Sequence, residues 1–225
     1  GKRYIEDADI DIKLKQGIVE KLYIEVVCHS GKDQAAAIIA GSHTHFVFAE
    51  RNDEVVLDER QPGGADEDDT DIQLSMHMVY DFAMTAPLDE ISFILKTKEY
   101  NMRAAELSIK GNYGHCLGKT MDRPMSHGIF GNSIFSHIIS RTASACDARM
   151  GGAMIPVMSN SGSGNQGICA TNPVAVYALE NENTEEELIR ALMLSHLTAI
   201  YIKQSLGKLS ALCGCVVASI GSSCG

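Results

Sequence analysis

The residues best suited to chemistry stand in one short stretch, MSNSGSGNQG, at 158–167. It places short hydroxyl and amide side chains among three glycines, between two apolar runs. Glycine lets a backbone turn its amides inward, and a helix start carries partial positive charge. Because the stretch holds no Lys or Arg, a carboxylate suits it better than a phosphate array. We therefore predict a loop at 158–171 that binds a small anion, with a flexible surface connection as the alternative. Its candidate ligand-binding residues are Ser159, Asn160, Ser161, Gly162, Ser163, Gly164 and Asn165.

Two charged residues precede this loop. Asp147 and Arg149 lie in ACDARMGG, at the end of a predicted helix and just before Gly151 and Gly152. At that place they would brace the loop or contact its ligand. The alternative is a helix C-terminal cap with exposed charges.

Three thiols near the end of the chain, Cys213, Cys215 and Cys224, raise the question of a metal site. In a helix, Cys213 and Cys215 would point about 200° apart, and Cys213 and Cys224 would lie ~16 Å apart on one face. At most one of them is therefore a ligand at any one site. The alternative is that all three pack as small hydrophobic side chains.

The histidines form no known catalytic pattern. His43 and His45 would share a face on a strand, and His196 in LSHLTAIY is typical of a hydrogen-bonded core histidine. The chain has no His-Glu-x-x-His zinc helix and no Gly-x-Ser-x-Gly nucleophile motif. GSGNQG is not a dinucleotide fingerprint, because no strand precedes it and no ribose-binding acid follows it.

Composition excludes several classes of function. The 225 residues carry a net charge of −10 and no basic stripe, which argues against nucleic-acid binding. The longest apolar runs, Leu192–Ile202 and Ala211–Ile220, are too short and too interrupted to span a membrane. Seven cysteines, an odd number mostly in apolar helical context, favour a reducing cytoplasm over a secreted disulfide framework. No signal peptide is evident, and the lack of an initiator Met suggests a trimmed chain.

The elements that must position these residues divide into two parts. Residues 1–60 are predicted to form a small α/β lobe. In it, Asp9–Lys15 and Lys21–Cys28 would be strands, Gly31–Gly41 a helix, and His43–Glu59 a hairpin turning at Asn52–Asp53.

An acidic linker follows, and then the pattern becomes helical. The stretch RQPGGADEDDTD marks a domain boundary, with the linker at 61–70 and a helical domain at 71–225. Pro87 would stop the first helix, Thr184 would open a capping box, and Asn172–Pro173 would start a helix. The fold class is thus α+β, a small α/β lobe followed by a mainly helical bundle. We predict helices at about 71–85, 88–110, 126–150, 173–181, 185–204 and 207–224.

The segments SACDARMGGAMIPVMSNSGSGNQGICATNPV and ALMLSHLTAIYIKQSLGKLSALCGC carry a resemblance to a known family. They resemble the α-domain of the iron–sulfur L-serine dehydratases, most closely the L-cysteine desulfidase branch. The similarity runs from about 125 to 225 and extends more loosely to AAIIAGSHTHF. It implies a lyase that uses a [4Fe–4S] cluster and no pyridoxal phosphate. The implied reaction is β-elimination, which converts L-cysteine to pyruvate, ammonia and hydrogen sulfide, or L-serine to pyruvate and ammonia.

The resemblance also assigns roles to residues. Cys213, in LSALC, matches the first of the family's three cluster ligands, and the residues from Ser159 to Asn165 match its substrate loop. The family's other two ligands, a cysteine pair further toward the C-terminus, have no counterpart before Gly225. Nothing here matches its N-terminal Cys-Thr-Glu-Pro-like motif, which holds the catalytic base. We therefore expect a central fragment that alone binds no stable cluster and has no activity.

Three interpretations of function stay open at this point. The first is cluster-dependent elimination from L-cysteine or L-serine, which share a carboxylate and an amine. The second is a non-enzymatic module that senses one of these amino acids with the same loop. The third is a structural helical domain with inert cysteines. Apolar helices rich in small residues would also allow a homo-oligomer.

Overall fold

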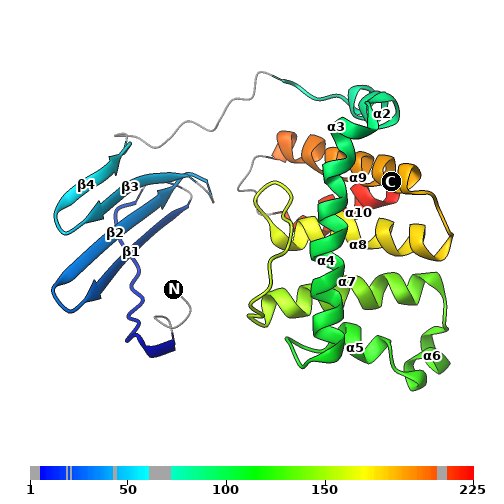
Figure 1. The fold of residues 1–225 in the computed structure, drawn as a ribbon, viewed down its shortest axis with the longest axis horizontal. Helices are drawn as coiled ribbons and strands as arrows, with labels where there is room; N and C mark the ends of the chain where they lie inside the picture. The colour runs from blue at the N-terminus through cyan, green and yellow to red at the C-terminus, as the bar shows by residue number, and fades with distance from the viewer. Residues whose placement is uncertain (1–5, 19, 21, 43–44, 61–71, 207–211) are drawn as a thin grey trace. The chain divides into compact units, whose positions relative to one another are not determined.

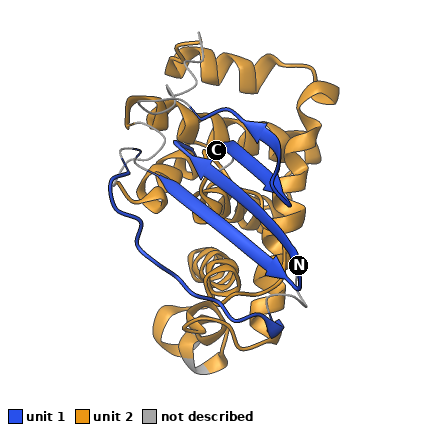
Figure 2. Ribbon diagram, turned by 90° about the vertical axis from the view of Figure 1, so that its left-hand side faces the viewer, with its two compact units in different colours: residues 1–69 blue, residues 70–225 orange. Residues whose placement is uncertain are grey.

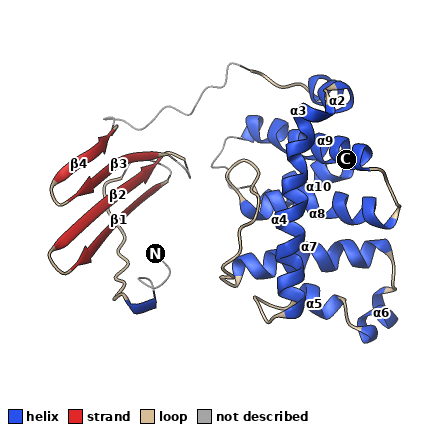
Figure 3. Ribbon diagram, viewed as in Figure 1, coloured by secondary structure: helices blue, strands red, loops and turns tan. Residues whose placement is uncertain are grey.

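The structure, a computed structural model, describes residues 6–18, 20, 22–42, 45–60, 72–206 and 212–225 (Figure 1). The chain divides into two compact units, residues 1–69 and 70–225 (Figure 2). All strands of the described residues lie in the first unit, and the second is built of helices (Figure 3). The fold class is α+β, as predicted. The predicted linker at 61–70 lies outside the described residues.

The first unit is a four-stranded antiparallel meander with strand order β1-β2-β3-β4. Asn52 and Asp53, with φ of 49° and 64°, form the two-residue turn between the last two strands, as predicted. The Asn52 side chain fixes this turn to β2, because its Nδ2 donates to Asp33 Oδ1 at 2.8 Å and its Oδ1 accepts from the Gln34 amide at 2.8 Å. The strands are β1 Tyr23–Ser30, β2 Asp33–Ala40, β3 Phe46–Arg51 and β4 Glu54–Asp58.

Two predictions in this unit are wrong. The segment 31–41, predicted as a helix because of its alanines, is mostly strand β2, paired on one side with β1 and on the other with β3. Pairing along both edges outweighs the high intrinsic helix propensity of Ala, because tertiary context overrides propensity. The segment Asp9–Lys15 alternates like a strand but forms none, and its Ile12 and Leu14 are 89% and 92% exposed. Alternation alone does not supply a partner strand or a core.

The second unit is built from helices of very different lengths. Its longest members are α4, α7, α8 and α9, and Figure 1 shows α7 and α8 as successive layers that α4 crosses. The helices are α2 Met76–Thr85, α3 Leu88–Ile91, the 3₁₀ turn η1 Ser92–Ile94, α4 Leu95–Lys110, α5 Leu117–Met121, α6 Pro124–Phe130, α7 Ile134–Met150, α8 Gly164–Glu180, α9 Glu185–Leu206 and α10 Gly214–Cys224.

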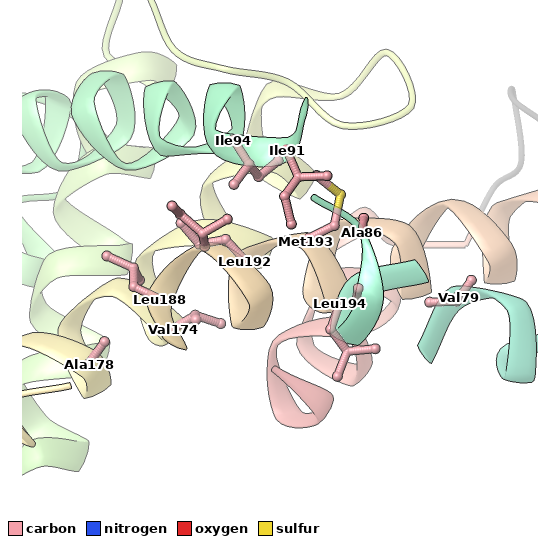
Figure 4. Close-up of a cluster of buried hydrophobic side chains, with 12 residues drawn as sticks. Val79, Ala86, Ile91, Ile94, Val174, Ala178, Leu188, Leu192, Met193 and Leu194 are labelled. Atoms are coloured by element: carbon pink, nitrogen blue, oxygen red, sulfur yellow. The ribbon is translucent and has the colours of Figure 1, made fainter. Parts of the chain in front are cut away.

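The main core of this unit lies where α2, α3, α8 and α9 meet (Figure 4). Leu192 of α9 is fully buried there, close to Ile91 and Val174 of two other helices. A second, alanine-rich cluster packs α4 against α7 and α8. The small side chains let these helices approach closely, and α8 is buried along most of its length.

Several helix boundaries follow the predicted signals. α2 ends before Pro87, and the Thr184 capping box opens α9, with Thr184 and Glu187 exchanging bonds between side chain and amide. The predicted helix at 126–150 is divided, because Gly131 takes a φ of 78° and Ser133 caps a new helix, α7. α10 begins at Gly214, and residues 207–211 of the predicted last helix lie outside the described residues.

The prediction for the start of α8 is wrong. The helix begins at Gly164 rather than near Asn172, and it runs through Pro173 without ending. Ser163 is its N-cap, since the Ser163 hydroxyl accepts from the amide of Gln166 at 3.3 Å. The Ser195 hydroxyl donates to the Ala170 carbonyl, close to the proline, at 2.7 Å. The predicted loop at 158–171 is therefore a short connection followed by two turns of helix.

Candidate functional site

The centre of the candidate site is a tight turn at 160–163. Asn160 and Ser163 exchange two backbone hydrogen bonds, of 3.1 and 3.0 Å. Between them, Ser161 and Gly162 take φ values of 47° and 79°. A serine in the left-handed region is uncommon and costs energy, so it is retained where the surroundings determine it. The first turn of α8 begins directly after this turn, at Gly164.

The start of α8 faces a guanidinium group from the preceding helix. Arg149, in the last turn of α7, donates from Nη1 to Asn165 Oδ1 at 3.1 Å. Its side chain also crosses Gly164 so closely that a Cβ there would lie 2.3 Å from Arg149 Nε. The amides of Gly164 and Asn165 belong to the first turn, where a helix offers no acceptor of its own. Two sources of positive potential, the helix start and the guanidinium, thus converge at one place.

Behind the turn lies a network of buried polar side chains. Asn160 is 4% exposed, and its Nδ2 lies 3.1 Å from His196 Nδ1 and donates to the His196 carbonyl at 3.1 Å. Its Oδ1 accepts from Gln166 Nε2 at 2.8 Å and from the Ser161 hydroxyl at 2.9 Å. The Asn160 side chain therefore joins the turn to both α8 and α9.

His196 sits deepest in this network. Burial lowers the pKa of His196 to about 4, so the ring is neutral at pH 7. Since Asn160 donates to Nδ1, the proton belongs on Nε2, which lies 3.0 Å from Thr171 Oγ1. Thr171 in turn donates to the Gly167 carbonyl at 2.7 Å. The network is continuous from the turn to α9, and the predicted core histidine is confirmed.

Asn101 of α4 extends the same network to the start of the connection. Its Oδ1 accepts from the Met158 amide at 2.8 Å, and its Nδ2 donates to Thr171 Oγ1 at 3.2 Å. The side chain is fully buried. No local pattern in the sequence marks Asn101, since it lies 57 residues before Met158.

The start of α10 packs on the start of α8. A Cβ added to Gly214 would lie 3.2 Å from Gln166 and 3.4 Å from the Ser163 hydroxyl. Cys213, the preceding residue, is the exposed N-cap of α10. A hydrogen bond from the Cys215 amide lowers the pKa of the Cys213 thiol. The structure thus brings the predicted metal ligand beside the predicted substrate-binding residues. Gln166 Oε1, fully buried, has no hydrogen-bond partner.

Asp147 faces a different part of the helical unit. Its carboxylate accepts from the amide of His115 at 3.0 Å and from the amide of Gly118 at 3.4 Å, at the start of α5. Asp147 is 8% exposed, and the chain at Gly114 packs against it. The structure therefore joins Arg149, and not Asp147, to the turn.

Among the remaining candidates, Cys224 lies away from this site and His45 belongs to the other compact unit. Cys224 is exposed at the far end of α10, and His45, just before β3, contacts the Ala40 carbonyl through Nδ1 at 3.1 Å. His43 lies outside the described residues. Ser159 and Gly162 are exposed at the turn, whereas Gly164 is buried. An open groove between α4, α8 and α9 carries both Lys and Glu side chains but none of the candidate residues.

Comparison with known proteins identifies the family of this chain. The sequence profile described as serine dehydratase alpha chain matches residues 21–225. The chain belongs to the serine dehydratase alpha chain family. The match covers most of both units, more than the resemblance noted from the sequence alone. No solved structure gave a significant match to the chain.

Curated relatives of this serine dehydratase alpha chain family member include three UPF0597 proteins. Those of Bacteroides fragilis and Bacteroides thetaiotaomicron are 63% and 62% identical to it over 225 residues. That of Porphyromonas gingivalis is 46% identical over 230 residues. Each alignment covers 100% of this chain, and 53%, 52% and 53% of the respective relative. The chain therefore spans about half the length of the curated relatives it matches.

The described residues of the site fit a metal cluster only in part. Among the described residues, no group of three or more His, Cys, Asp or Glu side chains is arranged to hold a metal ion. Cys213 alone combines exposure, a lowered pKa and a place beside the turn. The described residues thus offer one suitable thiolate and not a complete ligand set.

No helix among the described residues is long and apolar enough to cross a membrane.

Proposed function

We propose that the protein of which this chain forms part catalyses β-elimination on a small amino acid without pyridoxal phosphate. The leading substrate is L-cysteine, with pyruvate, ammonia and hydrogen sulfide as products. L-serine, with pyruvate and ammonia as products, is the second candidate, and it is favoured by the description of the family. Both substrates present the same α-carboxylate and α-amine.

One observation carries this proposal, the convergence of Arg149 and the first turn of α8. A guanidinium is favourable at the C-terminal end of α7, but it repels the positive end of α8. A bound carboxylate would relieve that repulsion and accept from the amides of Gly164 and Asn165. Arg can also hold a carboxylate with two parallel hydrogen bonds. The geometry therefore suits the carboxylate of an amino acid better than an uncharged ligand.

The polar network supplies rigidity rather than charge. Asn160 and His196 hold the turn from behind, and the neutral ring keeps His196 Nδ1 as the acceptor for Asn160 Nδ2. Ser161 places its hydroxyl on the same turn. A preorganised turn does not have to be ordered when the substrate binds, and this lowers the cost of binding.

The family resemblance implies a [4Fe–4S] cluster, and Cys213 is the one described residue suited to hold part of it. A cluster bound there would supply a Lewis-acidic iron for the leaving thiolate or hydroxyl. The catalytic base and the other cluster ligands are proposed to come from parts of the protein outside this chain. What the described residues do is bind the carboxylate and orient the Cα–Cβ bond toward Cys213.

The decisive experiment measures pyruvate release by the longer protein, anaerobically and after iron–sulfur reconstitution, with L-cysteine and L-serine in parallel. Turnover with either substrate supports elimination, and the faster substrate identifies the enzyme. A cluster visible in the absorbance spectrum without turnover of either would contradict it and favour an amino-acid sensor. A Cys213→Ala variant should lose pyruvate release, whereas a Cys224→Ala variant should keep it.

A further inference from the structure

Three thiols from three helices meet beneath the start of α10. Cys146 of α7, Cys169 of α8 and Cys215 of α10 lie around the small side chains of Ala170 and Ala218. Cys169 Sγ lies 3.8 Å from Cys215 Sγ, and Cys146 packs against the same cluster. The proposed function uses none of these three residues.

The arrangement suits a pair of thiols better than a metal site. No triad in the described part of the chain is arranged to hold a metal ion, this one included. The two sulfurs of Cys169 and Cys215, in contrast, are already in contact. A disulfide has an S–S bond of about 2.05 Å, so the two atoms would need to close by roughly 1.7 Å. Side-chain rotation and a small shift of the first turn of α10 can provide such a movement.

We propose that Cys169 and Cys215 form a reversible oxidation site, in which hydrogen peroxide or another two-electron thiol oxidant converts them to a disulfide joining α8 to α10. The S–H bonds of both residues break and one S–S bond forms. The two electrons and two protons released reduce one hydrogen peroxide to two water molecules. A dithiol reductant restores the two thiols by thiol–disulfide exchange and is itself oxidised to a disulfide.

Access and position favour this pair over the neighbouring ones. Cys215 is partly exposed in the first turn of α10, so an oxidant can reach it, whereas Cys169 is 8% exposed and shielded from alternative partners in solution. Cys146 and Cys169 both belong to long helices packed along their length. Of the three helices, α10 is the shortest and contributes Cys215 from its end.

The bond would act on the candidate site through α10. Gly214 packs against Gln166 and Ser163, and Cys213 and Cys215 flank it. A disulfide at Cys215 would therefore fix the start of α10 on the start of α8. Oxidation would set the position of Cys213 relative to the turn without using Cys213 itself.

The test maps disulfides in the purified chain after treatment with hydrogen peroxide. Free thiols are blocked, the protein is digested, and cross-linked peptides are identified by mass spectrometry before and after dithiothreitol. The reaction is followed to its end point. We expect a Cys169–Cys215 peptide as the main product and its loss on reduction. The oxidised chain should also melt at a higher temperature, because the bond closes a long loop.

Matched variants separate this pair from the other thiols. Cys169→Ser and Cys215→Ser should each abolish the cross-link and the rise in melting temperature, and Cys28→Ser and Cys224→Ser should leave both unchanged. Should a serine variant fail to fold, the alanine variant and the wild-type map still decide. A main product that joins Cys146 to Cys169 or Cys213 to Cys215 would overturn the proposal. So would a Cys169 that stays alkylatable in the unfolded protein after the oxidation has gone to completion.

Discussion

Asn160 is the residue on which the candidate site depends most. Its side-chain oxygen accepts a hydrogen bond from Gln166 of α8, and its side-chain nitrogen donates one to His196 of α9. Such a residue is hard to replace, because any substitution leaves at least one buried partner without a hydrogen bond. The same reasoning applies to His196, whose two ring nitrogens both face partners.

Replacement of His196 by alanine should destabilise the helical unit by about 2–4 kcal/mol, since it leaves Asn160 and Thr171 unpaired and opens a cavity. Urea unfolding followed by circular dichroism measures this change. His77→Ala is the matched control, because the His77 side chain is 85% exposed and its ion pair with Asp81 lies at the surface. The control should change the free energy of unfolding by less than about 0.5 kcal/mol. Equal effects of the two substitutions would contradict the network.

The pH dependence of stability tests the same ring without removing it. The His196 pKa falls from 6.5 in the unfolded chain to about 4 in the folded one. Between pH 6.5 and about pH 4, His196 binds a proton in the unfolded chain but not in the folded chain. The stability that the neutral His196 ring contributes is therefore fully present above pH 6.5 and is lost as the pH falls, with no further loss below about pH 4. Its size is about 3 kcal/mol.

The comparison that isolates this contribution is with His196→Gln, which does not titrate. Other groups, including carboxylates, add their own pH dependence, but they are common to both proteins. The difference in unfolding free energy between wild type and His196→Gln should thus change between pH 7 and pH 4. A difference that stays constant over this range would show that His196 is not buried and neutral.

Arg149 provides the test of the carboxylate site. Arg149→Ala should weaken amino-acid binding about 10- to 100-fold, which corresponds to the free energy of losing one hydrogen bond to a charged group. L-Alanine is a suitable probe for calorimetry on the longer protein, since it has the carboxylate and amine but no leaving group. Arg149→Lys keeps the charge without the two-pronged geometry and should bind with intermediate affinity. Arg103→Ala, an exposed arginine on α4, should bind as wild type does. Unchanged binding by Arg149→Ala would exclude this carboxylate site.

At the scale of elements, the close approach of α8 to the preceding chain positions the site. A Cβ on Gly167 would lie 2.0 Å from the Met158 carbonyl oxygen, which is backbone and has no room to move. Gly167→Ala should therefore cost about 1–3 kcal/mol of stability, or more if the turn is displaced. Gly128→Ala in α6 is the control, because a Cβ there meets nothing within 4 Å. It should be neutral or slightly stabilising in thermal unfolding. A neutral Gly167→Ala would contradict the packing.

The elements also show what sequence reasoning can reach. Local signals were sufficient for the Asn52–Asp53 turn, the stop before Pro87 and the Thr184 capping box, since each depends on residues within a few positions. They were misleading at 172–173, where Asn-Pro is typical of a helix start. Tertiary burial of α8 and the Ser163 cap moved that start to Gly164. The strand β2 was likewise decided by its two neighbours and not by its alanines.

The site follows the same division between local and long-range information. The turn residues and Arg149 are close in sequence, and their association was predictable. Asn101, Thr171 and His196 come from three helices, so their convergence needed the fold. The pairing of Cys169 with Cys215 was missed for the same reason, as 46 residues separate them.

At the scale of the whole molecule, the described part of this chain carries one half of a proposed catalytic centre. The proposed [4Fe–4S] cluster would need three protein thiolates, as the family resemblance implies, and the described residues offer Cys213 alone as a suitable one. The isolated chain should therefore hold far less than one cluster after anaerobic reconstitution and should release no pyruvate. The longer protein, treated in parallel, is the control and should bind iron and sulfide stoichiometrically. Iron and sulfide at four atoms each per isolated chain would contradict this prediction and show that the other ligands lie within it.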